Sequence, residues 1–412
     1  MPTLGERIRK LRKQQKMTLE TLAGTELTKG MLSLIENNKA NPSMESLNYI
    51  ADQLSVEVRE LLEEVSGHEL REVLEKAEIL FNTKYDDLTD EHQQLIHLVE
   101  PYVPKLTQGY EAARLLELYS RCLSRYNQQE SETILKRVAT MYEQLNLTAK
   151  RGEIGTVLAV IPFTNHNYQE ALDILLSERA KLEANPLWID PLSRLDYDYL
   201  EAVLYFAVGK YEDAIRLMEK AIEYSNKNKI FKQVDNLYRL AAVQAMMAED
   251  EEKMNHYLQK LLAYSEFADD EDSKIFIHFA EIHYLNSFKK MYIEADYLYQ
   301  TFSLQDINKK LFVPFFLLER GKTLFGLQKY EEAIAKLDDV VIPDILHHPI
   351  DLSIFYGKDA YIALCYLEMN QKEKALDAAT TALNHINVMP DTPYKTFIQE
   401  TYEKVQSNLS ID

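Results

Sequence analysis

The sequence predicts an all-α protein in which a small N-terminal helical domain precedes a long array of paired helices. Only 11 glycines and 12 prolines occur among 412 residues, and long stretches lack both. Because these residues interrupt helices more strongly than any others, their scarcity favours helix throughout. The other two observations are apolar residues at helical spacing in about the first fifty positions and a period of about forty residues thereafter.

Length and composition bound the class of protein. A chain of 412 residues is too long for one compact core, so several domains or an array are expected. No run of 18 uncharged apolar residues occurs, and the basic N-terminus lacks the apolar core of a signal sequence. We therefore expect a cytoplasmic protein with no membrane partner. Cys122 and Cys365 lie far apart in sequence, which argues against a disulfide framework or a zinc site, and we expect no cofactor.

Charge is unevenly distributed along the chain. The net charge is −20, yet residues 1–43 carry eight Lys and Arg against four Glu, a balance of +4. The remainder therefore carries −24. A basic head on an acidic body is the distribution expected when one domain binds DNA and the rest of the chain does not.

Hydroxyl residues stand ahead of the four short helices expected in the head. Thr3 and Glu6 form a capping-box pattern, in which each side chain satisfies a backbone N–H of the first turn. Thr18, Thr28 and Ser43 are expected to cap the second, third and fourth helices. The free N–H groups of the second helix then form a site for a phosphate.

The third helix of the head, residues 28–36, is expected to have two faces. The inward residues are predicted to be Met31, Leu32 and Ile35. The outward residues are predicted to be Lys29, Gly30, Ser33 and Leu34.

The head resembles the Cro/repressor-type helix-turn-helix domain, the XRE class, over about residues 4–62. The resemblance implies that the third helix enters the major groove of double-stranded DNA, and that Arg12 and Glu36 form a buried ion pair between the first and third helices. The positions implied to meet base edges are Lys29, Gly30, Ser33 and Leu34. The positions implied to lie near phosphates are Thr18, Lys39, Asn41 and Ser43. A helix-turn-helix used only for protein contact is the alternative.

Small residues recur through the rest of the chain at matching points of successive helix pairs. The residues that begin each second helix are Ala171, Ala214, Lys253, Ala295, Ala333 and Ala375. Twelve residues before these stand Ala159, Ala202, Ala241, His283, Gly321 and Ala363. Small side chains at both points allow two antiparallel helices to approach closely. An earlier, degenerate pair is expected over about residues 110–147. A generic helical bundle is the alternative, but it does not explain the repeated offset.

The twelve-residue offset is similar to that of the tetratricopeptide repeat, although the period here is longer than usual. The resemblance implies a right-handed superhelical solenoid with a concave groove. Its groove positions, carried over to this sequence, include Glu153 and Thr156. The residues expected to bind a peptide are Asp196, Tyr199, Asp235, Asn236, Tyr238, Tyr284 and Lys322. Carboxylates beside tyrosines can hold an extended peptide, although surface carboxylates on an acidic solenoid also serve solubility.

The head, a linker helix and long-period repeats together resemble the RRNPP family of peptide-pheromone receptors from Gram-positive bacteria. The resemblance implies a homodimer or higher oligomer that binds a two-fold DNA operator and a short imported peptide. We expect a neutral-to-basic or apolar peptide of about five to ten residues, because the body is acidic. The asparagines with which such receptors grip peptide backbones are absent at matching places, where Leu200 stands at one. Asn236 and Asn286 are off register.

The resulting domain prediction places the helix-turn-helix in residues 1–65, a linker helix in 66–82 and the repeats in 83–412. Ser66-Gly67 is the expected joint, and an amphipathic helix is predicted over residues 68–81. The predicted function is a DNA-binding transcriptional regulator whose repeats sense a signalling peptide. The alternative is a DNA-addressed scaffold whose repeats grip a partner protein.

An enzyme is the alternative from a different class. The sequence has no glycine-rich phosphate loop, nucleophile elbow or closely spaced cysteine pair. His278 and His283 are five residues apart, so they diverge by about 140° on a helix and make a poor metal pair. We therefore expect neither a catalytic site nor a metal site.

Overall fold

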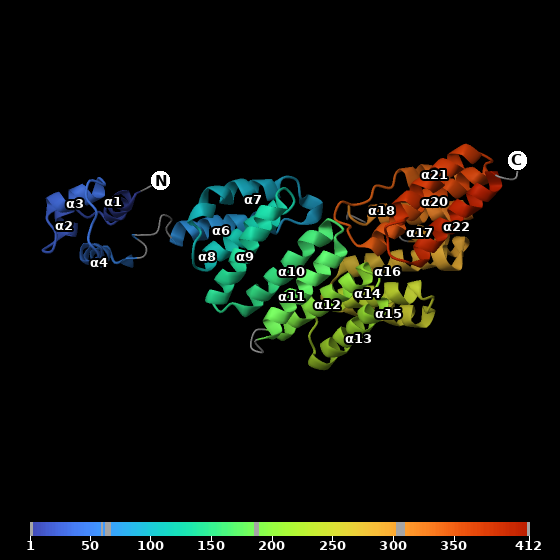
Figure 1. Cartoon of the computed structure of the whole chain (residues 1–412), viewed down its shortest axis with the longest axis horizontal. Helices are drawn as coiled ribbons and strands as arrows, with labels where there is room; N and C mark the ends of the chain where they lie inside the picture. The colour runs from blue at the N-terminus through green and yellow to red at the C-terminus, as the bar shows by residue number, and fades with distance from the viewer. Residues whose placement is uncertain (1–2, 59–60, 62–66, 185–188, 302–309, 410–412) are drawn as a thin grey trace. The chain divides into compact units, whose positions relative to one another are not determined.

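The computed structural model describes residues 3–58, 61, 67–184, 189–301 and 310–409. Within these ranges every regular element is a helix, so the all-α prediction is confirmed (Figure 1). The chain divides into two compact units, Met1–Asn146 and Leu147–Asp412. Ser66, half of the expected joint, lies outside the described residues. No helix among the described residues is long and apolar enough to cross a membrane.

The head at the start of the first unit begins with four short helices. They are α1 (Leu4–Gln14), α2 (Leu19–Ala23), α3 (Lys29–Glu36) and α4 (Met44–Gln53). The four predicted N-caps are confirmed, because Thr3, Thr18, Thr28 and Ser43 each accept a hydrogen bond from a backbone N–H of the following turn. The residues that fill the core between the helices include Ile8, Leu22, Leu32, Ile35 and Ile50. The prediction that Met31 faces inward is wrong.

Met31 is 41% exposed, whereas Leu32 and Ile35 are fully buried. The packed face of α3 is therefore narrower than the apolar pattern indicates. One face of a two-turn helix has room for few side chains, and Met31 begins the neighbouring face.

The remainder of the first unit is also helical. Its longer helices are α6 (Gly67–Phe81), α7 (Glu91–Val99), α8 (Tyr110–Leu123) and α9 (Gln128–Gln144), with short 3-10 turns at η1 (Tyr85–Asp87) and η2 (Glu100–Lys105). The amphipathic helix predicted over residues 68–81 is present as α6, and the degenerate pair is present as α8 and α9. Arg114 on α8 joins α6 to the interior of the pair through ion pairs with Glu78 and Glu117, both 2.7 Å.

The described residues of the second unit form six helix pairs and a final helix. The first helices of the pairs are α10 (Thr148–Thr164), α12 (Pro191–Ala207), α14 (Val234–Met247), α16 (Glu271–Tyr284), α18 (Val313–Gly326) and α20 (Pro349–Glu368). The second helices are α11 (Tyr168–Glu183), α13 (Tyr211–Asn228), α15 (Glu251–Ala268), α17 (Tyr292–Thr301), α19 (Tyr330–Asp338) and α21 (Lys372–Ile386). A turn of π-helix, η3 (Leu285–Lys289), extends α16, and α22 (Pro393–Leu409) follows the last pair.

A left-handed residue in the turn of each pair sets its register. These residues are His166, Gly209, Glu249, Lys290, Gln328 and Asn370, with φ between 54° and 77°. Each is followed five residues later by a fully or almost fully buried residue of the second helix. Those residues are Ala171, Ala214, Met254, Ala295, Ala333 and Ala375. A left-handed residue ends a helix by letting following N–H groups reach its last carbonyls, so the turn fixes where the next helix starts.

Five of the six predicted contact points on the second helices are confirmed, and Lys253 is wrong. Lys253 is exposed, and Met254 occupies the buried position. Twelve residues before Met254 stands Ala242, which packs in the same apolar cluster. Methionine fills irregular gaps with an unbranched side chain, so the two helices of this pair meet at a larger residue than those of the other pairs. The expectation of a small residue therefore placed the contact point one residue too early.

The last helices of the second unit pack against its first ones. Tyr168 at the start of α11 donates a hydrogen bond to the carbonyl of His347 at 2.8 Å, and Tyr211 at the start of α13 donates one to the carbonyl of Asp391 at 2.6 Å. One apolar cluster joins residues of α12, α13 and α14 to residues of α18, α20 and α22. The repeats of this unit therefore contact each other across its interior as well as between neighbours.

Candidate DNA-binding surface and ligand-binding face

The outer surface of the head displays most of the residues predicted to contact DNA. Seven are exposed, namely Thr18, Lys29, Gly30, Leu34, Lys39, Asn41 and Ser43, and Ser33 is half-buried. Thr18 and Ser43 are occupied as caps, so it is the first turns of α2 and α4 that present free N–H groups nearby. Such N–H groups are suited to phosphate oxygens.

Arg12 and Glu36 hold α1 against α3 from within. Arg12 Nε and Nη2 donate to the two carboxylate oxygens of Glu36 at 2.6 and 2.8 Å, and Nη1 donates to the carbonyl of Met17 at 2.9 Å. Both side chains are buried. The hydrogen bond to Glu36 raises the pKa of Arg12, so the guanidinium stays charged. The buried pair implied by the resemblance is present.

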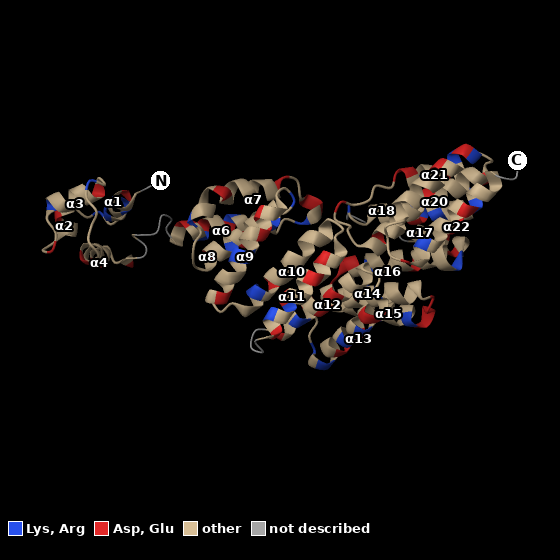
Figure 2. Ribbon diagram, viewed as in Figure 1, with Lys and Arg blue, Asp and Glu red and all other residues tan. Residues whose placement is uncertain are grey.

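The positive charge of the head is concentrated on α1 rather than on α3. Six of the eight Lys and Arg of residues 1–43 lie between positions 7 and 16 (Figure 2). On α3 itself the only basic side chain is Lys29, which pairs with the exposed Glu20. The charge that α3 offers to DNA is therefore small, and base contacts there depend on the exposed surface of α3.

The two glycines of this surface differ in whether packing requires them. Gly24, which ends α2 with φ of 53°, has no room for a Cβ, because the Tyr49 hydroxyl would lie 1.9 Å from it. Gly30 in α3 is open, since a Cβ there would meet only Thr28 Oγ1 at 3.9 Å. The glycine at 30 is thus not required by packing within the head.

The first helices of three successive repeats leave the same four positions partly open. In α10 these are Glu153, Thr156, Val157 and Val160. In α12 they are Asp196, Tyr199, Leu200 and Val203. In α14 they are Asn236, Arg239, Leu240 and Val243. Their spacing describes one face of each helix, and we call these twelve residues the open stripe.

The open stripe corrects the prediction for α14 by one residue. Asp235 and Tyr238 were the predicted counterparts of Asp196 and Tyr199, but the register set at Met254 places Asn236 and Arg239 there. Because one residue turns a helix by about 100°, this shift places a different set of α14 side chains on the open face.

Tyr238 accordingly lies in the core. It is 7% exposed, packs in an apolar cluster with its ring centroid 6.2 Å from that of Tyr257, and has its hydroxyl 3.4 Å from Asn226 Oδ1. Asp235 remains half-exposed beside the stripe. Asn236, off register in the sequence prediction, is in register in the structure.

The polar members of the open stripe differ in how far they are already paired. Asp196 accepts from Lys232 Nζ at 2.5 Å and from Gln233 Nε2 at 2.9 Å. Arg239 donates to Ser273 Oγ at 2.8 Å, while its Nε is buried without a hydrogen-bond partner in the described part of the chain. Burial raises the pKa of Tyr199 to about 12, so its hydroxyl remains a donor.

Tyr284 and Lys322, also predicted to contact the ligand, are buried in the structure. Tyr284 is 4% exposed and Lys322 is 2% exposed, so neither offers surface to a ligand. Lys322 Nζ instead contacts Glu319 Oε1 at 2.7 Å and lies over the ring of Tyr361. The sequence register alone does not reveal that Tyr284 packs in the apolar cluster of α14 and α15, or that Lys322 lies against the ring of Tyr361 on α20.

Lys322 belongs to a buried polar network that joins four helical segments. Glu319 on α18 contacts His283 Nδ1 of α16 at 2.7 Å and accepts from Asn286 Nδ2 of η3 at 2.9 Å. His283 Nε2 lies 2.9 Å from the hydroxyl of Tyr394 on α22. Burial alone raises the pKa of Glu319, but Lys322 and His283 outweigh it and lower the pKa to about 2. Burial also lowers the pKa of His283, which is therefore neutral.

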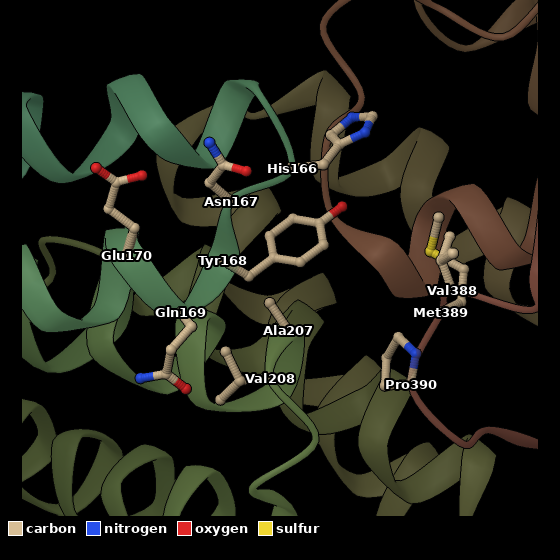
Figure 3. Close-up of a pocket in the computed structure, with 10 residues that line it drawn as sticks. All are labelled: His166, Asn167, Tyr168, Gln169, Glu170, Ala207, Val208, Val388, Met389 and Pro390. Carbon is tan, nitrogen blue, oxygen red and sulfur yellow. The ribbon is translucent and has the colours of Figure 1, made fainter.

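A cavity of about 670 Å³ lies where the α21–α22 connection meets the first repeats (Figure 3). Its lining comes from three segments, 166–170, 207–208 and 388–390. Tyr168 points from the start of α11 toward the last of these segments, with His166 beside it (Figure 3). No residue of this cavity was singled out in the sequence, because its walls come from segments more than 170 residues apart.

The comparisons place the head in a known class. Residues 8–61 match the helix-turn-helix family, so the head is a helix-turn-helix domain. No curated protein matches the sequence directly.

Solved structures similar to the chain include PlcR of Bacillus thuringiensis in complex with the peptide PapR7 and DNA. It is 18% identical, and the match covers 67% of this chain and 99% of that chain with a TM-score of 0.39. ComR from S. thermophilus in complex with DNA and its signalling peptide ComS is 18% identical, with 67% and 97% coverage and a TM-score of 0.29. The pheromone receptor Rgg2 of Streptococcus dysgalactiae is 17% identical, with 66% and 98% coverage and a TM-score of 0.30. The first two of these structures contain DNA and a peptide, and the third is a pheromone receptor.

Proposed function

We propose that the chain is a transcriptional regulator whose head binds an operator and whose repeats sense a short peptide. In this proposal residues 1–65 contact double-stranded DNA and residues 83–412 carry the sensing repeats. Residues 66–82 form the linker helix between them. Peptide binding alters the arrangement of two or more heads in a homodimer or higher oligomer, and thereby the affinity for a two-fold operator.

The exposed face of α3 carries the DNA-binding half of the proposal. This helix is capped by Thr28 and fixed to α1 by the buried Arg12–Glu36 pair, while Lys29, Gly30 and Leu34 remain exposed. A rigid helix that presents its first residues outward is the arrangement with which helix-turn-helix domains enter the major groove.

The DNA-binding half is tested by operator selection followed by electrophoretic shifts over a salt series. Lys29→Ala is expected to lower the affinity for the selected operator and to relax the sequence preference, because Lys29 lies on the helix proposed to contact the bases. Lys39→Ala is expected to weaken binding to all DNA sequences about equally, because Lys39 is proposed to contact a phosphate. The slope of log affinity against log salt concentration is then expected to fall in magnitude by about one. Lys220→Ala, an exposed lysine of α13, serves as the control. Unchanged affinity in both head variants would show that α3 does not read DNA.

The open stripe carries the sensing half of the proposal. It offers a backbone-binding amide at Asn236, an unsatisfied donor on Arg239 and the hydroxyl of Tyr199 on adjacent repeats. Polar groups repeated along a partly buried face are suited to an extended peptide, whose backbone groups repeat as well.

The sensing half is tested with pooled synthetic peptides of about five to ten residues, retained on the full chain and identified by native mass spectrometry. Arg239→Gln is expected to reduce retention while the operator affinity of the peptide-free protein stays unchanged. If the wild type retains no peptide, the protein-scaffold alternative replaces peptide sensing.

A further inference from the structure

Asp351 lies one helical turn after His348, whose Nε2 contacts the carbonyl of Val203 in the open stripe at 3.2 Å, and it was not singled out by any sequence motif. It is the third residue of α20, which begins at Pro349 after the N-cap His348. The side chain keeps partial solvent exposure, yet burial is the largest influence on its pKa, which is raised. The carboxylate is therefore largely surrounded by protein but remains accessible to solvent.

The one group that lowers the pKa of Asp351, His348, is not a cation. Its Nδ1 accepts a hydrogen bond from the backbone N–H of Ile350 at 3.3 Å, so the proton of the ring is on Nε2. That nitrogen donates to the carbonyl of Val203 on α12 at 3.2 Å. Burial lowers the pKa of His348 as well, which agrees with a neutral ring.

Asp351 therefore lacks a compensating charge. Within the described ranges its carboxylate has neither a hydrogen-bond partner nor an ion-pair partner. The N-terminus of α20 favours a carboxylate at this position, but that contribution is modest and is not enough to offset burial, since the pKa is raised. A buried carboxylate without a partner is rare in a structural role.

Three tyrosines on different helices interact electrostatically with this carboxylate. They are Tyr168 of α11, Tyr199 of α12 and Tyr394 of α22. The hydroxyls of Tyr168 and Tyr394 are engaged with His347 and His283. Tyr199 belongs to the open stripe, so a ligand on the stripe comes within electrostatic reach of Asp351.

We propose that Asp351 is the subsite of the ligand-binding face that receives a positively charged group of the ligand. A carboxylate without a charged partner attracts an ammonium or guanidinium group through charge-assisted hydrogen bonds. The inference rests on the proposed function in that the ligand is a peptide. The charged group is then its free amino terminus or a lysine or arginine side chain, and an acidic peptide is excluded at this point.

The subsite is tested first with small probes that do not depend on peptide recognition. N-acetyl-arginine methylamide is compared with its neutral isostere N-acetyl-citrulline methylamide by ligand-observed NMR on the full chain. Alanine amide is compared with its N-acetylated form to represent the amino terminus. In at least one pair the charged probe is expected to bind at least about tenfold more tightly than the neutral probe, as a charge-assisted hydrogen bond predicts. Equal signals within both pairs would overturn the subsite.

Two variants assign the site to Asp351. Asp351→Asn is expected to abolish the preference for the charged probe, whereas Asp377→Asn, which removes the same charge from the exposed surface of α21, is expected to retain it. Asp351→Asn is also expected to raise the melting temperature at neutral pH, because it removes an uncompensated charge. A preference that survives Asp351→Asn, or a variant that melts lower or does not fold, would contradict the proposal.

The peptide pools separate this inference from the proposed function. Each pool is made in free and acetylated forms, with one position fixed as arginine or as citrulline. Retention of the charged pools alone by the wild type supports both proposals. Retention without any charge preference overturns the subsite and leaves peptide sensing intact. Binding of the small charged probes without retention of any pool supports the subsite and overturns peptide sensing.

Discussion

Arg12 and Glu36 are the residues on which the shape of the head most depends. Removing either one alone strands the other charge in the core, and we expect Arg12→Ala or Glu36→Ala to lower the free energy of unfolding by about 3–5 kcal/mol. The double variant Arg12→Met/Glu36→Leu is expected to be milder, although the carbonyl of Met17 then loses its donor. Thermal and denaturant melts measure both. Small and equal effects in all three variants would mean that solvent screens the pair.

Gly30 offers a second test at the residue scale, because packing does not explain it. Alanine fits at this position, and Gly30→Ala is expected to stabilise the head by up to about 1 kcal/mol through helix propensity. If the backbone of α3 approaches DNA here, the same change weakens operator binding although the head is more stable. Melting and electrophoretic shifts on one protein sample distinguish the two effects. An unchanged operator affinity would place DNA away from Gly30.

At the scale of elements, the π-helical turn η3 brings α16 and α18 together around a buried charge. Asn286 lies in this turn and donates to the side chain and the carbonyl of Glu319 at 2.9 and 3.0 Å. The extra residue of a π turn shifts the helix face, which lets the amide point at α18. The network of Glu319, Lys322, His283 and Tyr394 therefore depends on an irregularity that helical periodicity does not predict.

The network has an expected pH dependence. The pKa of Glu319 is lowered to about 2 from an ordinary value of 4.5, so its contribution to stability is complete above pH 4.5 and is lost as the pH falls toward 2. The pKa of His283 is lowered from 6.5, so the unfolded chain takes up a proton first and stability falls below pH 6.5. We expect the free energy of unfolding of the full chain to decrease from pH 6.5 downward.

The variant Glu319→Gln isolates one part of this dependence. At neutral pH it leaves Lys322 buried without its carboxylate, and a loss of about 3–5 kcal/mol is expected. The difference from wild type is expected to shrink as the pH falls from 4.5 toward 2, because the unfolded wild-type chain takes up a proton on Glu319 before the folded chain does. Chemical denaturation at several pH values measures it, with Glu319→Gln/Lys322→Met as the control that removes both charges. A difference that is constant with pH would place the effect in packing rather than charge.

At the scale of the whole molecule, the second unit departs from an open chain of repeats. Tyr168 bonds to His347, Tyr211 bonds to Asp391, and His283 contacts Tyr394, so the last helices are fixed to the first and middle ones. In an open array each repeat touches only its neighbours, and the end frays first. Contacts between distant repeats instead join the ends in one cooperative structure.

Hydrogen exchange tests this cooperativity. Amides of α22 are expected to be protected to nearly the same extent as those of α12 and α14, because one apolar cluster joins them. Tyr211→Phe combined with Tyr168→Phe is expected to speed exchange in α20 and α22 more than in α14, since both hydroxyls hold segments next to those helices. Rapid exchange of the α22 amides in the wild type would indicate that the contacts between the last helices and the earlier ones are weak.

Features that depend on nearby residues were predictable from the sequence, whereas those that depend on distant residues were not. The caps at Thr3, Thr18, Thr28 and Ser43 depend on residues three positions away, and all were predictable. The assignment of Tyr238 to the groove was not, since it required locating Met254 as the contact point of the pair. Asp351 gave no signal, because its neighbours Tyr168 and Tyr199 are more than 150 residues distant in sequence.

Local sequence patterns were enough to predict the helical class, the capped helices of the head and the repeated twelve-residue offset. These features arise from local propensity and from periodic apolar faces, which act within a few turns of helix. The residues that remain open to a ligand depend on tertiary packing instead. A shift of one residue turns a helix face by about 100°, and distant helices cover some predicted positions, as they do Lys322, and leave others such as Tyr199 partly open. Burial is a property of the whole packing, so the ligand-binding face is fixed by contacts that no local pattern contains.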